Sequence, residues 1–514
     1  MHKKTPEIIL HVFRWLKIHN RHFCRRIQFF FIIKPQKRVK NIWIKPQKRV
    51  NLHIAKPQKR VSEIMKRKIY SKLQEWKKES NGTSAVLVEG ARRIGKSYIV
   101  EEFAKNEYKS YILINFRRAP QEVKSWFDIY LEDLDKLFMN LQVHYNKQLT
   151  ARNSVIIFDE VQDCPRAREA VKFLVEDGRY DYIETGSLVS IKKNVKDIVI
   201  PSEEIKMEMF PMDFEEFLWA MGNDTMMDYI KNCFESKTPM GQALNRRAMD
   251  LFRLYMVIGG MPQAILKYIE TKDFAAVELV KYQILTLYRN DIAKYADNAE
   301  TKVTSIFDAI PGQLQKHEKK FKLSALKPDA RMRDYDSAFF WLSDARIINC
   351  CYNSTVPALG LRLNEERTTL KCYMADTGLL ITHAFGIRGR VPAEVYQKLI
   401  LGKLDTNEGM ITENIVAQML AAEGHKLFFY SNPSNENADE RMEIDFLIQK
   451  KAITSRHNIS PIEVKSGKRF TLNSLQKCIK RFATVLSTPY VIYDGDLKVD
   501  GTVVYVPYYM TGLL

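Results

Sequence analysis

The sequence predicts an α/β protein: a P-loop parallel sheet with a helical lid, followed by a winged helix and a second α/β domain. Three observations predict this order. Short apolar runs alternate with helical stretches between residues 65 and 210, as in a parallel sheet covered by helices on both faces. Residues 90–97 fit the phosphate-binding pattern G-x-x-x-x-G-K-[ST] at every fixed position. The region 376–514 holds two further strand-like runs that carry acidic residues and a lysine.

A basic tail precedes these domains. The hexapeptide Lys-Pro-Gln-Lys-Arg-Val occurs at 34–39, 45–50 and 56–61. Each copy carries a proline, which disfavours a continuous helix, so we expect residues 1–64 to be disordered. Two interpretations remain open for this tail. It is either a basic arm that neutralises phosphates or a translated upstream DNA repeat, with the true start at Met65.

Composition limits the class of protein. Most of the net charge of +19 lies in the tail, so the body is nearly neutral and DNA binding there would have to rest on local patches. No apolar run approaches the ~20 residues of a transmembrane helix, and the N-terminus lacks a signal-peptide layout. The seven cysteines show no C-x-x-C spacing. These features predict a cytoplasmic protein with reduced thiols and no membrane partner.

A P-loop NTPase site is predicted at the first strand. Residues 85–89 form a short apolar run and residues 98–105 read as a helix, which is the context that the pattern needs. Backbone N–H groups of the loop would cradle the phosphates of ATP. Lys96 would reach the β- and γ-phosphates, and Ser97 would hold Mg²⁺. The predicted ATP-binding residues of the loop are Gly90, Ala91, Arg92, Arg93, Ile94, Gly95, Lys96 and Ser97.

A second strand supplies two carboxylates. Residues 154–159 are apolar and end in Asp159, and Glu160 comes next. Asp159 would hold Mg²⁺ through water, which adds it to the cofactor-binding set. Glu160 would orient or deprotonate the attacking water, so Glu160 and Lys96 are the predicted catalytic residues. The alternative is a buried strand with an acidic exit, and the correct order and spacing of the two motifs favour the nucleotide site.

Two more strands complete the predicted sheet, at 110–116 and 182–186. The second of these ends in small polar residues. Thr185 or Ser187 would sense the γ-phosphate there, or the run is a strand that leads into a turn.

The pattern turns helical between 211 and 295, with a turn at 259–262. A helical lid on the nucleotide domain, whose core spans 65–210, is the natural interpretation. The next module, 296–375, is predicted to be a winged helix made of three short helices and a hairpin. The helices are expected at 303–310, 323–326 and 331–342, and the strands at 346–353 and 368–373.

Three arginines lie near the third helix of that module: Arg331, Arg333 and Arg346. They would meet DNA phosphates if the winged helix binds DNA. The alternative is a packing module with solvated arginines.

The last predicted domain holds a candidate second active site. Glu463 and Lys465 would share one face of a strand, since alternate residues point the same way. Asp445, on a neighbouring strand, and Glu463 would bind a divalent metal, and Lys465 would position the attacking water. Glu413, on a helix upstream, would complete this metal or nuclease site. Acids on sheet edges can also be structural.

That ordered set resembles the restriction-endonuclease-like, or PD-(D/E)xK, fold. Residues 65–514 as a whole resemble prokaryotic AAA-type ATPases fused to a C-terminal domain of unknown function. The resemblance rests on the stretches Gly90–Ser97, Phe158–Gln162, Glu184–Ser187, Gly259–Pro262, Ala375–Leu380 and Ile462–Lys465. It implies an ATP-binding domain, an interposed winged helix and a restriction-endonuclease-like domain at 376–514. Members often carry an arginine after the sensor strand, where this chain has Lys192 and Lys193.

The sequence therefore supports three hypotheses. The first is an ATPase that uses Mg·ATP to drive domain rearrangement and acts on DNA. The second is a nucleotide-gated module that binds DNA or a protein without significant turnover. The third adds a metal-dependent DNA nuclease controlled by the ATPase. The expected partners are ATP, DNA, and a protein partner or a second copy of the chain.

Overall fold

The computed structural model describes residues 65–187, 199–296, 299–316, 319–386, 390–402, 408–434, 440–450, 452–467 and 469–514. All of them belong to one compact unit of the chain. The predicted basic tail, 1–64, and Lys192 and Lys193 lie outside the described residues. Within the described ranges, no helix is long and apolar enough to cross a membrane.

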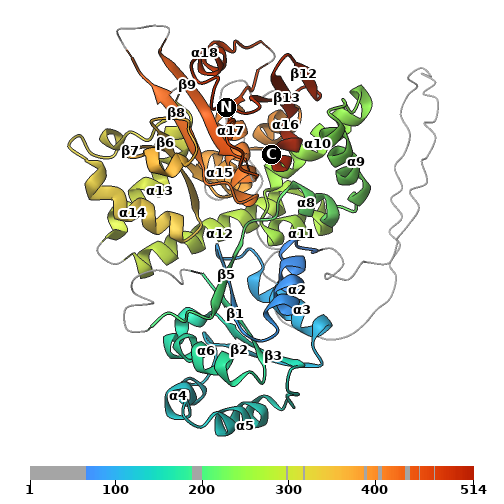
Figure 1. Ribbon diagram of the computed structural model, residues 1–514, viewed down its shortest axis with the longest axis vertical. Coiled ribbons are helices and arrows are strands. Elements are labelled where there is room, and N and C mark those ends of the chain that lie inside the picture. The colour runs from blue at the N-terminus through green and yellow to red at the C-terminus, as the bar shows by residue number, and fades with distance from the viewer. Residues whose placement is uncertain are drawn as a thin grey trace, which may run out of the picture. The chain divides into compact units, whose positions relative to one another are not determined.

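The first sheet is parallel throughout and has the order β2-β3-β4-β1-β5 (Figure 1). Its strands are β1 (Ala85–Gly90), β2 (Ser110–Asn115), β3 (Ser154–Asp159), β4 (Asp181–Gly186) and β5 (Glu204–Met209). The four predicted strands are confirmed. The fifth, β5, was not predicted, because its charged residues alternate with apolar ones on an edge strand that is half exposed.

Helices cover both faces of this sheet, as the alternation of its side chains requires. Val86 and Val88 of β1 pack with α3 (Lys96–Glu107), whereas Leu87 packs with α6 (Pro165–Asp177) on the opposite face. The other helices of this region are α2 (Ile69–Ser80), α4 (Gln121–Ile129) and α5 (Leu134–Tyr145). The carboxyl ends of all five strands therefore meet at one edge of a rigid sheet.

The predicted lid region is helical, as expected. Its helices are α8 (Phe214–Ala220), α9 (Asp224–Ser236), α10 (Gln242–Ile258), α11 (Pro262–Thr271) and α12 (Phe274–Tyr295). A capping box fixes the start of α8: the Asp213 side chain accepts from the Glu216 backbone, and the Glu216 side chain accepts from the Asp213 backbone. The predicted turn at 259–262 separates α10 from α11.

The predicted winged-helix elements are found near their expected positions. They are α13 (Glu300–Leu314), the 3₁₀ turn η3 (Leu323–Ala325), α14 (Met332–Asp344) and the antiparallel pair β6 (Ile348–Ser354) and β7 (Glu365–Met374), with the 3₁₀ turn η4 (Leu361–Asn364) between these strands. However, β6 also pairs in parallel with β8 (Phe428–Asn432). The hairpin is thus continuous with the C-terminal sheet, and the expected boundary between 375 and 376 falls within a sheet.

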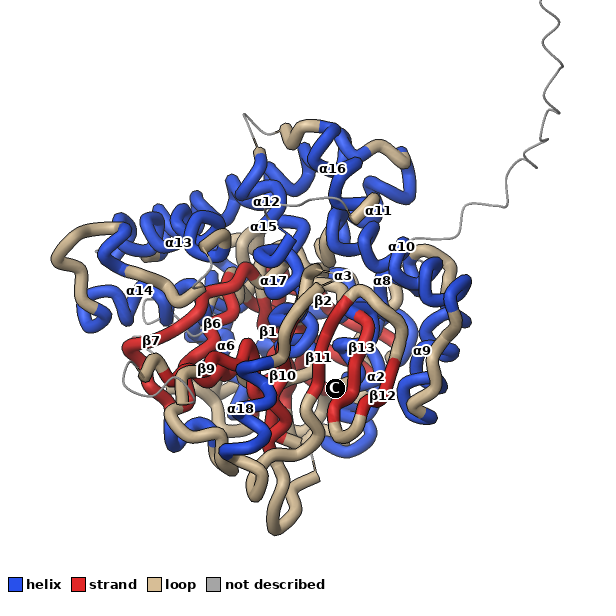
Figure 2. The backbone as a smooth tube through the Cα atoms, turned by 90° about the horizontal axis from the view of Figure 1, so that it is seen from above, coloured by secondary structure: helices blue, strands red, loops and turns tan. Residues whose placement is uncertain are grey.

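That second sheet is mixed and has the order β12-β13-β11-β10-β9-β8-β6-β7. Figure 2 shows its strands β10, β11, β13 and β12 next to one another. Its remaining strands are β9 (Met442–Gln449), β10 (Ile459–Val464), β11 (Tyr490–Tyr493), β12 (Lys498–Asp500) and β13 (Val503–Pro507). Helix α17 (Glu408–Ala422) packs on one face and α18 (Asn473–Arg481) on the other. The other elements are α15 (Thr377–Phe385), α16 (Ala393–Ile400) and the C-terminal 3₁₀ helix η5 (Tyr508–Leu513).

Two glycine-containing stretches that the sequence singled out meet at the end of α10. Asp376 caps α15 by accepting from the Leu379 backbone, and it also accepts from the backbone N–H of Gly260 at 2.5 Å. Gly259 has φ +85° and lies so close to Gly378 that a Cβ on Gly378 would stand 2.6 Å from the Gly259 Cα. The backbone of the turn before α11 is therefore in direct contact with the backbone at the start of α15.

Gly378→Ala should lower the free energy of unfolding by about 1–3 kcal/mol, because backbone atoms would have to move to admit the methyl group. Chemical denaturation of the full chain measures this. Gly312→Ala is the matched control, since a Cβ at Gly312 in α13 meets no atom within 4 Å. Equal effects of the two substitutions would contradict the proposed close packing.

Candidate nucleotide-binding site

The P-loop connects the end of β1 to the start of α3. Gly95 has φ +93° immediately before the helix, a conformation that favours glycine. Gly90 cannot carry a side chain either, because a Cβ there would stand 2.2 Å from the backbone oxygen of Met209 in β5. The loop therefore places the unpaired N–H groups of the α3 N-terminus toward the carboxyl edge of the sheet, where a phosphate would bind.

Lys96 is buried at the first position of α3. Its Nζ donates to the backbone oxygens of Gly90 at 2.9 Å and Ala91 at 2.8 Å. Burial lowers the pKa of Lys96 to about 8, against the opposing effect of the Glu160 and Asp159 carboxylates. The Lys96 ammonium is thus buried inside the P-loop. Burying its charge costs free energy, and contact with a bound phosphate would offset that cost.

Asp159 is the centre of the site. Its carboxylate accepts from the Ser97 hydroxyl at 2.5 Å, from the Asn115 side-chain amide at 2.5 Å and from the Thr185 hydroxyl at 2.6 Å. These donors come from α3, β2 and β4. The structure therefore brings the two predicted Mg²⁺ ligands, Ser97 and Asp159, into contact, and their hard oxygen atoms fit the metal. Of the two sensor candidates, Thr185 is the one that contacts Asp159.

Glu160 follows β3 in a left-handed conformation, with φ +57°. Its backbone N–H donates to the Thr185 hydroxyl at 3.3 Å. Its carboxylate accepts from Gln162 at 2.6 Å and from Arg117 at 3.0 Å, and Arg117 also donates to Asp163 at 2.9 Å. The predicted catalytic carboxylate is therefore already engaged, by a cation that the sequence motifs did not reveal.

Both Asn115 and Arg117 were missed by sequence reasoning. They stand at and just beyond the end of β2, which carries no recognisable motif. The signal that would have found them is the strand order: β2 pairs with β3, and Asn115 lies directly opposite Asp159.

A cavity of about 450 Å³ opens beside these residues. Its walls include the loop residues Arg92, Arg93, Lys96 and Ser97, the carboxylates Asp159 and Glu160, Arg117 and Arg118 after β2, Met65 and Arg67 before α2, and Pro262, Gln263 and Leu266 of α11. Arginines on several sides would suit a polyphosphate, and the volume lies within the range of small-molecule sites. Arg92 is itself paired with Asp291 of α12 at 2.5 Å.

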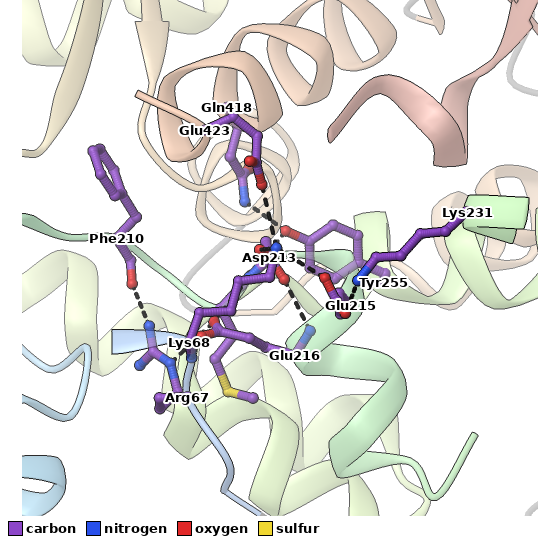
Figure 3. Close-up of polar contacts among 11 residues, drawn as sticks. Arg67, Lys68, Phe210, Asp213, Glu215, Glu216, Lys231, Tyr255, Gln418 and Glu423 are labelled. Carbon is purple, nitrogen blue, oxygen red and sulfur yellow. Dashed lines mark hydrogen bonds and ion pairs between the residues drawn. The ribbon is translucent and has the colours of Figure 1, made fainter. Parts of the chain in front are cut away.

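Arg67 lines the cavity and contacts the lid, and Figure 3 shows its bonds to Phe210 and Glu216. Its guanidinium donates to the Ile94 backbone oxygen in the P-loop at 2.6 Å, to the Phe210 backbone oxygen at 2.6 Å and to Glu216 of α8 at 3.0 Å. Both Arg67 and Glu216 are buried. A single guanidinium therefore joins the backbone of the P-loop to the capping box of α8.

The next residue, Lys68, extends this network (Figure 3). Its ammonium pairs with Asp213, the residue before α8, at 2.6 Å and with Glu215 in α8 at 3.0 Å. It also pairs at 3.2 Å with Glu423, the residue after α17. Tyr255 of α10 lies nearby and its hydroxyl accepts from Gln418 of α17 at 3.0 Å. The segment before α2 thus contacts the nucleotide domain, the lid and the C-terminal region.

The four residues of the predicted second site also come together. Asp445 on β9 accepts from the Val464 backbone at 2.8 Å, and Lys465 donates to Glu463 at 2.6 Å. Burial and the nearby Asp445 carboxylate raise the pKa of Glu463 to about 8. Glu413 on α17 belongs to the same cluster through a buried lysine, Lys371 of β7, which no sequence motif indicates.

The predicted DNA-binding arginines are placed differently from one another. Arg331 and Arg333 are exposed at the start of α14. Arg346 instead pairs with Glu89 of β1 at 3.1 Å and with Glu208 of β5. Arg346 is therefore engaged with the first sheet.

Nucleotide affinity should fall as pH rises above about 8. Bound phosphate stabilises the ammonium form of Lys96, so its pKa is higher in the complex than the value of about 8 in the free protein. Below pH 8 the ammonium is already present and affinity changes little. Above pH 8 binding requires proton uptake, which weakens it by up to ~10-fold per pH unit. Calorimetry at pH 8.5 in two buffers of different ionisation enthalpy would detect that proton, and identical heats in both buffers would contradict this prediction.

Comparisons with known proteins agree with the P-loop assignment. Residues 82–218 match the model of an AAA domain, residues 249–390 match a domain of unknown function (DUF8612), and residues 408–510 match another (DUF4143). No curated protein matches the chain. 

Three solved structures show a remote likeness. The Walker-type ATPase PABY2304 of Pyrococcus abyssi is 14% identical, with 64% of this chain and 98% of that chain covered and a TM-score of 0.37. The ORC2 protein of Aeropyrum pernix in its ADP form is 14% identical, with 69% and 97% covered and a TM-score of 0.23. The Drosophila ORC bound to DNA is 11% identical, with 65% and 95% covered and a TM-score of 0.24. The matched family model and the geometry of the loop together show that this chain contains an AAA-type P-loop domain.

Proposed function

We propose that this protein is an ATPase that hydrolyses Mg·ATP and uses the reaction to rearrange its domains, acting on DNA. The observation that supports it best is the meeting of Lys96, Ser97, Asp159 and Glu160 at one sheet edge, beside a cavity lined by arginines. Bound Mg²⁺ would neutralise charge on the phosphates, and Ser97 and Asp159 would hold it. Lys96 would bind the β- and γ-phosphates, and Glu160 would orient the attacking water.

The contacts around the cavity support a coupling to the lid. Pro262 and Leu266 of α11 line the cavity, and the turn before α11 is held by Asp376 through Gly260. Nucleotide that contacts α11 would therefore act on an element that is tied to the start of α15. Arg67 offers a second connection, from the P-loop to α8.

The contacts of Arg117 support the proposal that ATP turnover is restrained in the free protein. Its guanidinium and the Gln162 amide both donate to one oxygen of Glu160, so they fix the orientation of this carboxylate and draw negative charge from the group that would act as the base. We propose that this pairing must open before Glu160 reaches water. Since Arg117 also pairs with Asp163, its release would leave the cation a second partner close by.

Lys96→Ala should abolish ATP binding, because it removes the buried ammonium of the loop. Glu160→Gln should keep ATP binding and reduce turnover by roughly 10²–10⁴-fold, the usual contribution of a positioned base. Binding is measured by calorimetry and turnover by phosphate release. If Lys96→Ala bound ATP like the parent, the site would be wrongly assigned. Unchanged turnover in Glu160→Gln would remove that residue from the base role.

Arg117→Ala should raise turnover in the absence of any partner by up to ~5-fold, the gain expected from losing one partly exposed ion pair. Arg166→Ala is the control, because Arg166 of α6 forms exposed pairs with Asp128 of α4 and Glu169 of α6. A fall in turnover would instead mean that Arg117 stabilises charge on the transferred phosphoryl group.

The nucleotide-gated module is the competing function. Phosphate release by the full chain, with and without double-stranded DNA, separates it from the ATPase. Turnover that DNA stimulates and Glu160→Gln removes would support the proposal. Tight ATP binding without turnover under both conditions would favour a gated binding module and direct attention to a missing protein partner.

A further inference from the structure

The cluster of acidic residues in the second sheet has a lysine at its centre. Lys371 of β7 has a side chain that is only 1% exposed. Its Nζ lies 3.3 Å from Glu413, 3.0 Å from Glu443 and 3.5 Å from Asp445. These three carboxylates come from α17 and β9, so the ammonium joins three elements that are distant in sequence.

We infer that the ammonium group of Lys371 takes the position that a divalent cation would need in this cluster. The site is then an internal ion-pair lock, not a metal centre. Ammonium nitrogen and carboxylate oxygen atoms at 3.0–3.5 Å suit ion pairing, whereas Mg²⁺ needs oxygen ligands at about 2.0–2.1 Å in a near-octahedral arrangement. Consistently, no three His, Cys, Asp or Glu side chains in the described ranges are arranged to hold a metal ion.

The surrounding donors also occupy the carboxylate oxygens. One oxygen of Glu413 accepts from Lys371 and from the Tyr373 hydroxyl, and the other accepts from Lys319. Lys319 is brought there by the residue after it, Lys320, which forms an isolated bridge with Lys371. Both oxygens of Glu413 are thus bound to groups that would repel a cation or compete with it.

The other acids of the cluster are similarly engaged. One oxygen of Asp445 accepts from the Val464 backbone and the other faces Lys371. Glu443 lies between Lys371 and Lys320, and Glu463 is paired with Lys465. Within the described part of the chain, a single oxygen of Glu463 is the one buried carboxylate atom of this cluster without a hydrogen-bond partner. One free oxygen is too few for a metal site.

The two interpretations differ in the sign of a stability change. In an ion-pair lock, Glu413→Gln removes the counter-charge of two lysines and should lower the unfolding midpoint in EDTA. In an empty metal site the carboxylates repel one another, so the same substitution should raise the midpoint. Nucleotide-free full-length protein is used, with Glu440→Gln as the control, since Glu440 forms an exposed pair with Arg481.

A second variant tests whether the ammonium holds the cation position. Lys371→Ala removes the ammonium and frees the space that its side chain fills, so millimolar Mn²⁺ should raise the midpoint of this variant and leave that of the parent unchanged. Lys426→Ala is the matched control, because Lys426 forms a partly exposed ion pair with Glu365. If Lys371→Ala does not fold, the Glu413→Gln comparison still decides the question.

Two outcomes of the stability measurements would overturn the inference, and one outcome of a cleavage assay would do so as well. One is a midpoint of the parent protein that rises with Mn²⁺ and loses this response in Asp445→Asn. The other is stabilisation by Glu413→Gln in EDTA. Mg²⁺-dependent DNA cleavage by the parent that Asp445→Asn abolishes would have the same meaning, and would restore the nuclease hypothesis.

Discussion

The hydrogen bonds that converge on the Asp159 carboxylate fix the geometry of the nucleotide site. The donors Ser97, Asn115 and Thr185 stand on three different elements, and none can shift without breaking a bond to a buried charge. The strand order makes this convergence possible, because β4 lies between β1 and β3 and β2 lies on the other side of β3. The parallel sheet places all of their carboxyl ends at one edge, so the loop, the acid and the sensor hydroxyl are assembled by the topology.

The two predicted sites, both within the described part of the chain, arrange their charges differently. At the first, lysine and arginine side chains border a cavity, and the carboxylates lie beside it. At the second, Lys371 lies among the carboxylates and leaves little for a ligand to contact. Removing one partner from a buried ion pair is more costly than replacing the pair, so such a cluster can persist as structure. The first group can therefore bind an anionic ligand, whereas the carboxylates of the second group are already neutralised by Lys371 and the neighbouring lysines.

Local motifs explain how much of the site could be predicted. Lys96 and Ser97 follow a strand and begin a helix, and Asp159 and Glu160 end another strand, so short sequence windows identify them. Arg117 and Asn115 depend on the pairing of β2 with β3, which no short window reveals. Lys371 is separated from Glu413 by two further helices, α15 and α16, and is brought to it only by the packing of α17 on the second sheet.

Patterns of burial explain the rest of the fold. Helices and strands with an apolar face were predicted well, including the hairpin of β6 and β7. The edge strand β5 was missed because Glu204, Lys206 and Glu208 interrupt its apolar residues. The continuity of that hairpin with β8 was also not expected, since a parallel pairing between β6 and β8 joins segments that lie far apart in the chain.

Met65 has a consequence for the way a nucleotide would be felt in the lid. Its side chain is buried and lines the nucleotide cavity, two residues before Arg67. Arg67 binds both the P-loop backbone and Glu216 of α8. A nucleotide that pushed Met65 aside would therefore pull on the short segment that carries Arg67, and the start of α8 would receive that displacement through a buried ion pair.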